Sequence, residues 1–338
     1  MRKLATIRKI DSINPIEGAD AIECAVVGGW TTVIKKGDFK VDDLVVYCEI
    51  DSWIPNSIAP FLSKGHEPRE YMGVPGERLR TVKLRGQVSQ GLILHRYVAL
   101  DKVGEIYEGM DVSDLLNINK YEPPVSAQLA GQMSGGFPSF IPKTDQERIQ
   151  NLTRDFDRWK ERGYTWEETE KLEGSSMTVF IKDGNIGVCS RNWELKETEG
   201  NTLWALARQG NLLETVFKHM GMNVAFQGEV IGPGIQGNKY KLTKHEFHIY
   251  DMYDIDAQRY FSPAQRHAIV YQFGLTHVPA KLDATSFVGV DVNSLIASAD
   301  GESLVGAAKP KREGLVFKCN EAPASFKVIS NSFLLKSE

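Results

Sequence analysis

Long apolar runs are absent from the 338 residues of this sequence, and an excess of positive charge is missing too. No stretch approaches the roughly 18 consecutive apolar residues that a membrane-spanning helix needs, and charges interrupt the first residues, so we expect neither a signal peptide nor a transmembrane segment. We therefore predict a cytoplasmic protein. Because 40 Lys and Arg stand against 44 Asp and Glu, any contact with nucleic acid must come from local basic patches.

Cysteine is scarce. The four cysteines, Cys24, Cys48, Cys189 and Cys319, are widely spaced, and no two have the spacing of a zinc or redox motif. Each lies in or beside an apolar segment, which predicts buried, reduced thiols. The chain is 42% apolar and long enough for two domains, each with a core of its own.

The first hundred residues contain short runs rich in β-branched and aromatic residues, separated by Gly, Pro and Asn. The predicted strands are Leu4 to Ile10, Ile22 to Val27, Trp30 to Ile34, Leu44 to Ile50, Arg80 to Leu84 and Gly91 to His95. Strands of this number and spacing predict an OB-like β-barrel over residues 1–124, with a role in nucleic-acid contact. Asp111 to Leu116 has the pattern of a short capped helix.

A basic segment lies inside this half. Strand alternation puts Arg78 and Arg80 on one face and Lys83 and Arg85 on the other, so a shared basic face needs a bulge. Two interpretations stay open, a surface for a phosphate backbone and ordinary solvated strand charges.

Residues 125–141 are rich in Pro, Gly and Ser and are predicted to link the barrel to a second domain at 142–338. Mixed strands and helices in this domain, without regular alternation, predict an α+β fold with mainly antiparallel sheets. The expected helices begin at Thr144 or Asp145, Asn201, Ser262 and Val292 and end near Arg162, Met220, Phe273 and Ala299. Asp183 to Asn185 has the composition of a hairpin turn.

The stretch with the clearest chemistry runs from Glu170 to Ser176. Lys171 stands between two carboxylates and before a glycine, which puts a potential nucleophile beside a potential metal ligand. A lysine attacks phosphorus only as a neutral amine, and its reference pKa of about 10.4 makes neutralisation near pH 7 cost roughly 4 to 5 kcal/mol. Nearby positive charge lowers that pKa, and a bound divalent metal is the strongest candidate.

The residues from Lys171 onward resemble, in the same order, the motifs of the covalent nucleotidyltransferases, which include DNA ligases, RNA ligases and mRNA capping enzymes. The matching segments are Lys171 to Gly174, Ser190 to Asn192, Phe226 to Glu229, Phe247 to Asp251, Arg312 to Lys318 and Ser325 to Ser330.

The resemblance narrows further within that superfamily. Segments Lys143 to Asn151 and Glu229 to Tyr240, and a barrel that ends in Lys120 to Pro124, are similar to the Deinococcus- and Naegleria-type RNA ligases. Their OB domain precedes the catalytic domain, whereas in DNA ligases and capping enzymes it follows the fifth motif.

This resemblance implies an ATP-dependent RNA ligase. Lys171 would take AMP from ATP, pass it to a 5′-phosphate end, and leave a 3′-hydroxyl to displace AMP and seal the strand. Glu173 and Glu313 are expected to hold Mg²⁺ or Mn²⁺ through its waters, and Lys318 and Lys327 to draw charge off the α-phosphate. The implied nucleotide contacts are Phe247 and Glu170 at adenine, Arg191 and Glu229 at ribose, and Lys143 and Arg148 at the β and γ phosphates.

One position departs from the family pattern. Many relatives have a second lysine two residues after the first in the fifth motif, where this chain has Ile329, so Lys327 acts alone or another cation substitutes. The expected partner is a nicked duplex of RNA or RNA/DNA hybrid with RNA at the 3′-hydroxyl side, bound by a monomer. A DNA-nick ligase, a guanylyltransferase and a non-catalytic nucleic-acid-binding protein remain alternatives.

Overall fold

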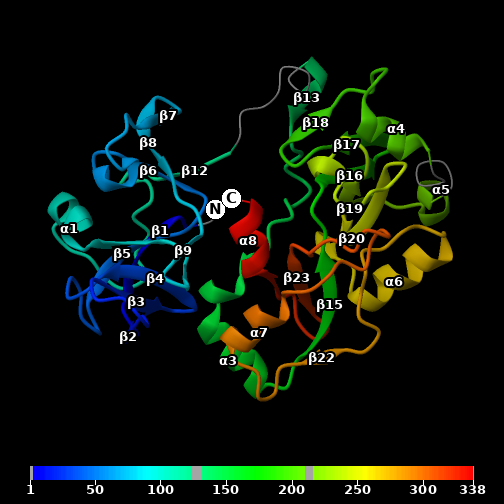
Figure 1. Ribbon diagram of the computed structural model, residues 1–338. Helices are drawn as coiled ribbons and strands as arrows, with labels where there is room; N and C mark the ends of the chain where they lie inside the picture. Colours follow the sequence, from blue (N-terminus) through cyan, green and yellow to red (C-terminus); the bar gives the residue numbers. More distant parts are fainter. Residues whose placement is uncertain (1–2, 123–130, 210–215, 338) are drawn as a thin grey trace. The chain divides into compact units, whose positions relative to one another are not determined.

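The computed structural model describes residues 3–122, 131–209 and 216–337 (Figure 1). The chain forms two compact units, one of Met1–Pro124, Ile149–Asp155 and Leu334–Glu338, the other of Val125–Arg148 and Phe156–Phe333. Within the described residues, no helix combines the length and the apolar character that crossing a bilayer requires.

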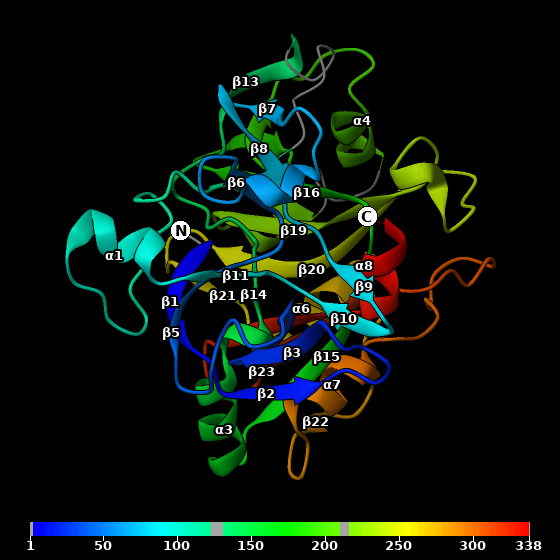
Figure 2. The same cartoon turned by 60° about the vertical axis from the view of Figure 1, so that its left-hand side comes forward.

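Short antiparallel strands build the first unit (Figure 2). One sheet has β1 (Ala5–Lys9), β5 (Leu44–Cys48) and β11 (Leu92–His95), and another has β2 (Ser12–Pro15), β3 (Ile22–Val27) and β4 (Trp30–Lys35). A third has β12 (Asn119–Lys120), β6 (Ser52–Pro55), β8 (Val74–Arg78) and β7 (Arg69–Tyr71), and β9 (Val82–Leu84) pairs with β10 (Gln87–Ser89). The helical pieces are η1 (Pro60–Ser63) and α1 (Tyr97–Val103). Two buried apolar clusters form the core of this unit.

The segment η2 (Ile149–Asn151) belongs to the first unit although it lies far along the chain. The Gly29 amide donates to the Gln150 carbonyl at 3.0 Å. The side-chain oxygen of Asn151 accepts from Trp30 Nε1 at 2.7 Å and from the Arg8 guanidinium at 2.9 Å, and its amide donates to Glu49 at 2.6 Å. The first unit therefore includes chain that follows Pro124.

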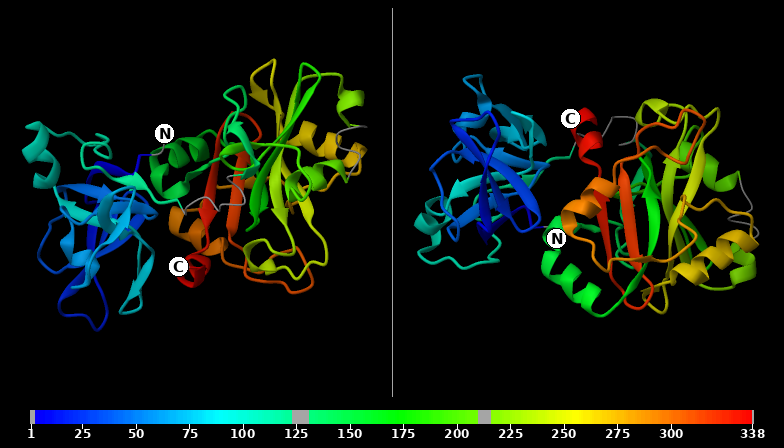
Figure 3. Two further views of the ribbon diagram at one scale, coloured as in Figure 1. Left: turned by 90° about the horizontal axis from the view of Figure 1, so that it is seen from above. Right: turned by 60° about the horizontal axis from the view of Figure 1, so that its bottom comes forward.

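Two larger sheets form the second unit (Figures 1 and 3). The seven-stranded sheet has the order β13 (Met133–Gly136), β18 (Trp193–Leu195), β17 (Asn185–Cys189), β16 (Ser175–Lys182), β19 (Val224–Ile231), β20 (Glu246–Asp254) and β21 (Arg259–Tyr260). The five-stranded sheet has the order β14 (Glu147–Arg148), β24 (Ser325–Ile329), β23 (Gly314–Cys319), β15 (Thr165–Lys171) and β22 (Thr285–Ser286). Only β14 and β24 pair in parallel among the described strands, so the expected α+β class with mainly antiparallel sheets is confirmed.

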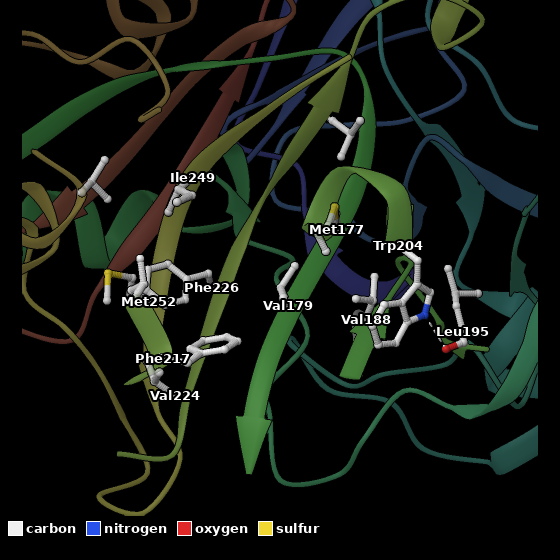
Figure 4. Close-up of a cluster of buried hydrophobic side chains, with 14 residues drawn as sticks. Met177, Val179, Val188, Leu195, Trp204, Phe217, Val224, Phe226, Ile249 and Met252 are labelled. Atoms are coloured by element: carbon white, nitrogen blue, oxygen red, sulfur yellow. Dashed lines mark hydrogen bonds between the residues drawn. The ribbon is translucent and has the colours of Figure 1, made fainter. Parts of the chain in front are cut away.

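Helices and an apolar cluster cover the seven-stranded sheet. Figure 4 shows Met177, Val179 and Phe226 of this sheet in that cluster, with Trp204 donating from Nε1 to the Leu195 carbonyl at 2.9 Å. The helices of the second half are α3 (Thr153–Glu161), α4 (Thr202–Arg208), α5 (Phe217–Met220), η4 (Gln236–Asn238), α6 (Pro263–Gln272), α7 (Val292–Ser298) and α8 (Asn331–Ser337). All four cysteines are buried and free, as expected.

Most predicted elements are present, but two predicted helices are wrong. The helix expected from Thr144 or Asp145 begins only at Thr153, because Glu147 and Arg148 pair with β24 and tertiary pairing overrides local propensity. The segment from Asp111 consists of turns, and the Ser113 hydroxyl accepts from the amides of Leu4 and Ala5 at 3.0 Å.

Two other predictions concern the second unit. The helix expected from Asn201 to Met220 corresponds to α4 and α5, and residues 210–215 between them lie outside the described residues. The hairpin turn after β16 is confirmed, with Asp183 at φ 50° and Gly184 at φ 78°.

Candidate active site

Strand register brings the expected nucleophile to its acidic neighbour. In the antiparallel pair of β15 and β23, Lys171 lies opposite Gly314, so Glu313 comes just before the partner strand begins. Lys171 Nζ lies 2.6 Å from Glu313 Oε1. Two residues that are far apart in the sequence thus form one ion pair.

The same sheet gathers the other expected cations on one face. Cross-strand partners point to the same face, and side chains alternate along a strand. Arg148 is opposite Lys327, Lys327 is opposite Val316, and Val316 is opposite Thr169. Lys171 follows Thr169 by two residues and Lys318 follows Val316 by two, so the expected cations Arg148, Lys171, Lys318 and Lys327 share this face. Glu170 alternates to the other face.

Glu229 approaches the nucleophile from the seven-stranded sheet. It lies opposite Ser176 in β16, and its carboxylate accepts a hydrogen bond from the backbone of Gly174. A β-carbon on Gly174 would collide with the Val230 carbonyl oxygen and the Glu229 side chain, so this turn requires glycine. Burial raises the pKa of Glu229 to about 7; Glu313 adds to the rise, and Lys171 opposes it.

The charge state of Lys171 follows from these neighbours. Burial by itself lowers the pKa of Lys171, but Glu313 and Glu229 raise it more, and the net pKa lies above the ordinary value. In the absence of a metal ion the amine is therefore protonated at neutral pH. The two carboxylates hold Lys171, the expected nucleophile, in its protonated form.

Lys318 connects the two sheets. Its ammonium donates to the Tyr250 carbonyl and lies 2.8 Å from Asp251 Oδ1. Burial lowers the pKa of Lys318, and Asp251 opposes that shift. Asp251 Oδ1 also lies 3.6 Å from Arg266 NH1, so this carboxylate contacts two buried cations.

Glu167, His267 and His277 offer three ligand atoms within 4.8 Å of one another, and no other such trio occurs in the described ranges. Arg266 fills that place, because its guanidinium donates to both Glu167 oxygens and to His277 Nε2. His277 Nδ1 is 2.6 Å from the Val278 carbonyl, so both ring nitrogens are engaged. These side chains form a buried charge network around Arg266 rather than a metal site.

Lys327 lies beside Asp145, with Nζ 2.7 Å from Oδ1. The other oxygen of Asp145 faces the Arg191 guanidinium at 3.8 Å. Burial lowers the pKa of Lys327 to about 8, against the effect of Asp145, while Lys171 and Arg148 lower it further. Ile329, which replaces the family's second lysine, lies opposite Gly314 and is buried at 4% exposure.

The three acidic residues Glu173, Glu229 and Glu313 provide oxygen ligands, which are those that Mg²⁺ and Mn²⁺ prefer. Glu229 and Glu313 act on each other and on Lys171, which shows that negative charge is concentrated around the nucleophile. Glu173 instead pairs with Lys239, and its backbone amide donates to the Tyr240 hydroxyl at 2.8 Å. The carboxylate oxygens of these three residues do not all lie within 4.8 Å of one another, so they fit a divalent cation held through its waters rather than by direct ligation.

The expected nucleotide contacts are spread over both sheets. Glu170 Oε2 accepts from the Leu304 amide at 2.8 Å, and its buried Oε1 has no hydrogen-bond partner in the described parts of the chain. Phe247 is half-buried opposite Val230 and fills the space that a β-carbon on Gly228 would need. Lys143 Nζ donates to the Asn192 side chain at 3.2 Å.

The motif pattern did not indicate Asp145, Asp251 or Lys239 as site residues. Asp251 lies inside a recognised segment, and Asp145 follows Lys143 by two residues, so position alone could have raised them as candidates. Their ion pairs with Lys327, Lys318 and Glu173 depend on strand register and loop geometry, which the sequence pattern does not specify.

Known proteins share this architecture. The family model of the OB-fold domain matches residues 4–96, and that of RNA ligase matches residues 164–329. A solved variant of Naegleria gruberi RNA ligase without ligand is 48% identical, with a TM-score of 0.91 over 99% of this chain and 98% of that chain. The chain belongs to the RNA ligase family.

Other solved forms of the Naegleria gruberi RNA ligase agree. A variant with ATP and Mn is 47% identical, and a form with PPi is 48% identical; each has a TM-score of 0.90 and covers 99% of both chains. No curated protein sequence matches the chain. The expected enzyme class and the N-terminal OB fold of this RNA ligase are thereby confirmed.

Proposed function

We propose that this protein is an ATP-dependent RNA ligase that seals 3′-hydroxyl/5′-phosphate nicks through a lysyl-AMP intermediate on Lys171. The observation that carries the proposal is the Lys171–Glu313 pair at 2.6 Å, on the same sheet face as Arg148, Lys318 and Lys327. The related Naegleria gruberi ligase has been solved with ATP and Mn, with AMP and Mn and with PPi, which are the substrate, metal and products of such a reaction.

In the first step Lys171 Nζ attacks the α-phosphorus of ATP, the bond to the bridging oxygen of the β-phosphate breaks, and pyrophosphate leaves. The amine must first lose a proton, which Glu313 and Glu229 oppose while they face it as free carboxylates. A divalent cation held by Glu173 and Glu313 would supply positive charge that offsets the carboxylates and favours the neutral amine.

We assign to Lys318 and Lys327 the stabilisation of the charge that develops on the α-phosphate oxygens. Each is already neutralised by an aspartate, so an arriving phosphate has to compete with Asp251 and Asp145. Arg148 is the neighbour of Lys327 in the adjacent strand and is the cation we assign to the role of the missing second lysine.

A preference for ATP over GTP is supported by the related ligase, which has been solved with ATP and with AMP. A guanylyltransferase is therefore the less favoured alternative. The adenine contact of Glu170 rests on the family resemblance alone, because Glu170 lies on the sheet face opposite to Lys171 and is buried at 5% exposure.

Two further steps complete the sealing. A 5′-phosphate oxygen attacks the phosphorus of lysyl-AMP and releases Lys171, and a 3′-hydroxyl then attacks the adenylated 5′ end and releases AMP. We assign RNA to the 3′-hydroxyl side of a nicked RNA or RNA/DNA duplex. The monomeric state and the cytoplasmic location remain predictions.

Incubation with α-labelled ATP and Mg²⁺ tests the proposal. Label should remain on the denatured protein, and it should disappear when the metal is chelated or in Lys171→Ala. Lys182→Ala, in β16, the next strand along the chain, is the matched control and should be labelled normally. Absence of label on the native chain, or equal label on Lys171→Ala, would sink the mechanism.

Nick sealing separates the remaining alternatives. Four nicked duplexes with RNA or DNA on each side of the nick should be sealed only where the 3′-hydroxyl side is RNA. Preference for DNA there would indicate a DNA-nick ligase. Tight binding of nicks without any labelling would indicate a non-catalytic nucleic-acid-binding protein.

A further inference from the structure

A loop that carries none of the expected site residues is held against the nucleophile turn. It runs from Gln236 to Tyr240, immediately after the glycine-rich end of β19. Gln236 and Asn238 have φ values of 43° and 47°, and Lys241 beyond the loop has 52°. Left-handed backbone at non-glycine residues costs free energy and persists where surrounding contacts hold it.

Three contacts join this loop to the turn after Lys171. The Tyr240 hydroxyl accepts from the Glu173 amide at 2.8 Å, and Tyr240 is buried at 1% exposure. The Gln236 side-chain amide donates to the Gly174 carbonyl at 3.4 Å. Lys239 forms an ion pair with the Glu173 carboxylate. The loop thus fixes both the backbone and the charge of Glu173.

Lys239 is held at this place by aromatic rings as well. Its ammonium lies 4.6 Å from the ring centre of Phe333 and 5.7 Å from that of Tyr240. The side chains of Lys239 and Glu173 are 20% and 24% exposed, so the pair is partly shielded from water. Such a pair is stronger than one on the open surface.

Each carboxylate expected to hold the metal is therefore neutralised by a lysine. Lys171 neutralises Glu313, and Lys239 neutralises Glu173. Lys171 is the nucleophile of the proposed reaction, whereas that reaction assigns no chemical role to Lys239. A lysine ammonium and a hydrated divalent cation compete for the same carboxylate oxygens.

We propose that Lys239 is a positioning residue that occupies the Glu173 carboxylate until a divalent cation displaces it. This inference rests on the proposed function, because Glu173 is a metal-holding residue only in an adenylating enzyme. The exchange keeps Glu173 in place before the metal arrives, and it raises the metal concentration that the site requires.

Mn²⁺ binding to the full chain without nucleotide, measured by electron paramagnetic resonance, tests the exchange directly. Lys239→Met removes the competing ammonium and keeps the packing against Phe333, so Mn²⁺ should bind roughly three- to tenfold more tightly. Lys241→Met is the matched control, because Lys241 is exposed, two residues away and without an ion pair among the described residues. It should bind Mn²⁺ like the native chain.

A second variant shows whether Lys239 acts through Glu173. Glu173→Gln should weaken Mn²⁺ binding, and adding Lys239→Met to it should change nothing more, because the two residues form one unit. Lys239→Gln replaces Lys239→Met if far-UV circular dichroism shows that the latter is misfolded. Unchanged or weaker Mn²⁺ binding in the Lys239 variant, or a gain that persists without the Glu173 carboxylate, overturns the inference.

The Mn²⁺ binding of the Lys239 variants and the labelling by ATP test different claims. A native chain that takes label from ATP but shows no gain of Mn²⁺ affinity in Lys239→Met retains its proposed function and loses this inference. A native chain that takes no label loses the proposed function, whatever the metal titration shows.

Discussion

Lys171 and Lys327 share one face of the five-stranded sheet, yet their environments shift their pKa values in opposite directions. Burial lowers both. Lys171 also faces Glu313 and Glu229, and its pKa ends above the ordinary value, whereas Lys327 is paired with Asp145 and its pKa falls to about 8. Since burial is the largest influence on both lysines, the opposite directions of the two pKa shifts come from the carboxylates that face each of them.

The difference assigns separate tasks to the two ends of the site. In the proposed mechanism, a protonated Lys171 cannot attack until its carboxylates are otherwise engaged, which would link its reaction to the arrival of metal. Lys327 carries a charge that is costly to bury and that a phosphate can stabilise. The proposal thus requires Lys171 to lose its proton and Lys327 to keep its own.

The largest expected effect comes from replacing Glu313, the main carboxylate that raises the pKa of Lys171. Glu313→Gln should slow formation of lysyl-AMP at pH 7 by at least about 10²-fold, because the site loses a carboxylate that holds the metal. The same change removes the main group that raises the pKa of Lys171, so the rising limb of the pH–rate profile should move to lower pH. The profile is measured by rapid-quench labelling.

Glu302→Gln, an exposed glutamate of the same domain, is the control and should leave both quantities unchanged. A Glu313→Gln profile that rises at the native pH, or at a higher pH, would show that Glu313 does not set the protonation of Lys171.

The second prediction concerns the cost of burying the charge of Lys327. Below about pH 8 the folded chain keeps this buried lysine charged. Between about pH 8 and 10.5 the folded chain binds fewer protons than the unfolded chain. The free energy of unfolding therefore rises with pH in that window. A pKa difference of this size corresponds to about 3 kcal/mol. Lys327→Met should raise the free energy of unfolding at pH 7 by up to that amount and remove the pH dependence, while adenylation is lost.

Urea denaturation at pH 7 and pH 9.5, followed by tryptophan fluorescence, measures the effect. Lys218→Met, at an exposed lysine of α5, should change neither value. Loss of stability in Lys327→Met at pH 7 would mean that the Asp145 pair outweighs the cost of burial.

The smallest expected effect concerns the β9–β10 hairpin of the first unit, whose cations have no carboxylate partner in the described part of the chain. Lys83 and Arg85 form no ion pair within the described residues, whereas Arg78 is bound to Asp51 at 2.6 Å and stacks on Tyr121. If Lys83 and Arg85 contact phosphates, replacing both by Ala should weaken binding of a nicked duplex and reduce the salt slope of log K by about 2.

Fluorescence anisotropy over a series of salt concentrations measures that slope. Lys102→Ala, on the exposed side of α1, is the control for a general loss of positive charge. An unchanged slope in the double variant would show that Lys83 and Arg85 do not contact phosphates and are ordinary solvated charges.

Sequence patterns indicated strands such as β3 and β4, because β-branched and apolar residues are concentrated in them. They missed β15, whose sequence from Thr165 to Lys171 is polar, because its buried Glu167 depends on Arg266, which comes from a distant helix. They also extended a helix across Arg148, where sheet pairing prevails.

Some residues of the candidate site could be predicted from the sequence and others could not. Ordered motifs gave the lysines and glutamates by type and spacing, and strand register now brings Lys171, Glu313, Lys318 and Lys327 together. The partners Asp145 and Lys239 could not be predicted, because their contacts arise from loops whose backbone is left-handed or irregular. The direction of each pKa shift likewise needs neighbours that only the folded chain supplies.

The central claim is that Lys171, stored as a protonated amine, is the residue that accepts AMP. Proteolysis of the chain after reaction with ATP and Mg²⁺, with mass spectrometry of the peptides, tests it most directly. AMP is expected on Lys171 and on no other lysine, in an amount that falls as the pH is lowered. AMP on another residue, or a native protein without AMP, would contradict it.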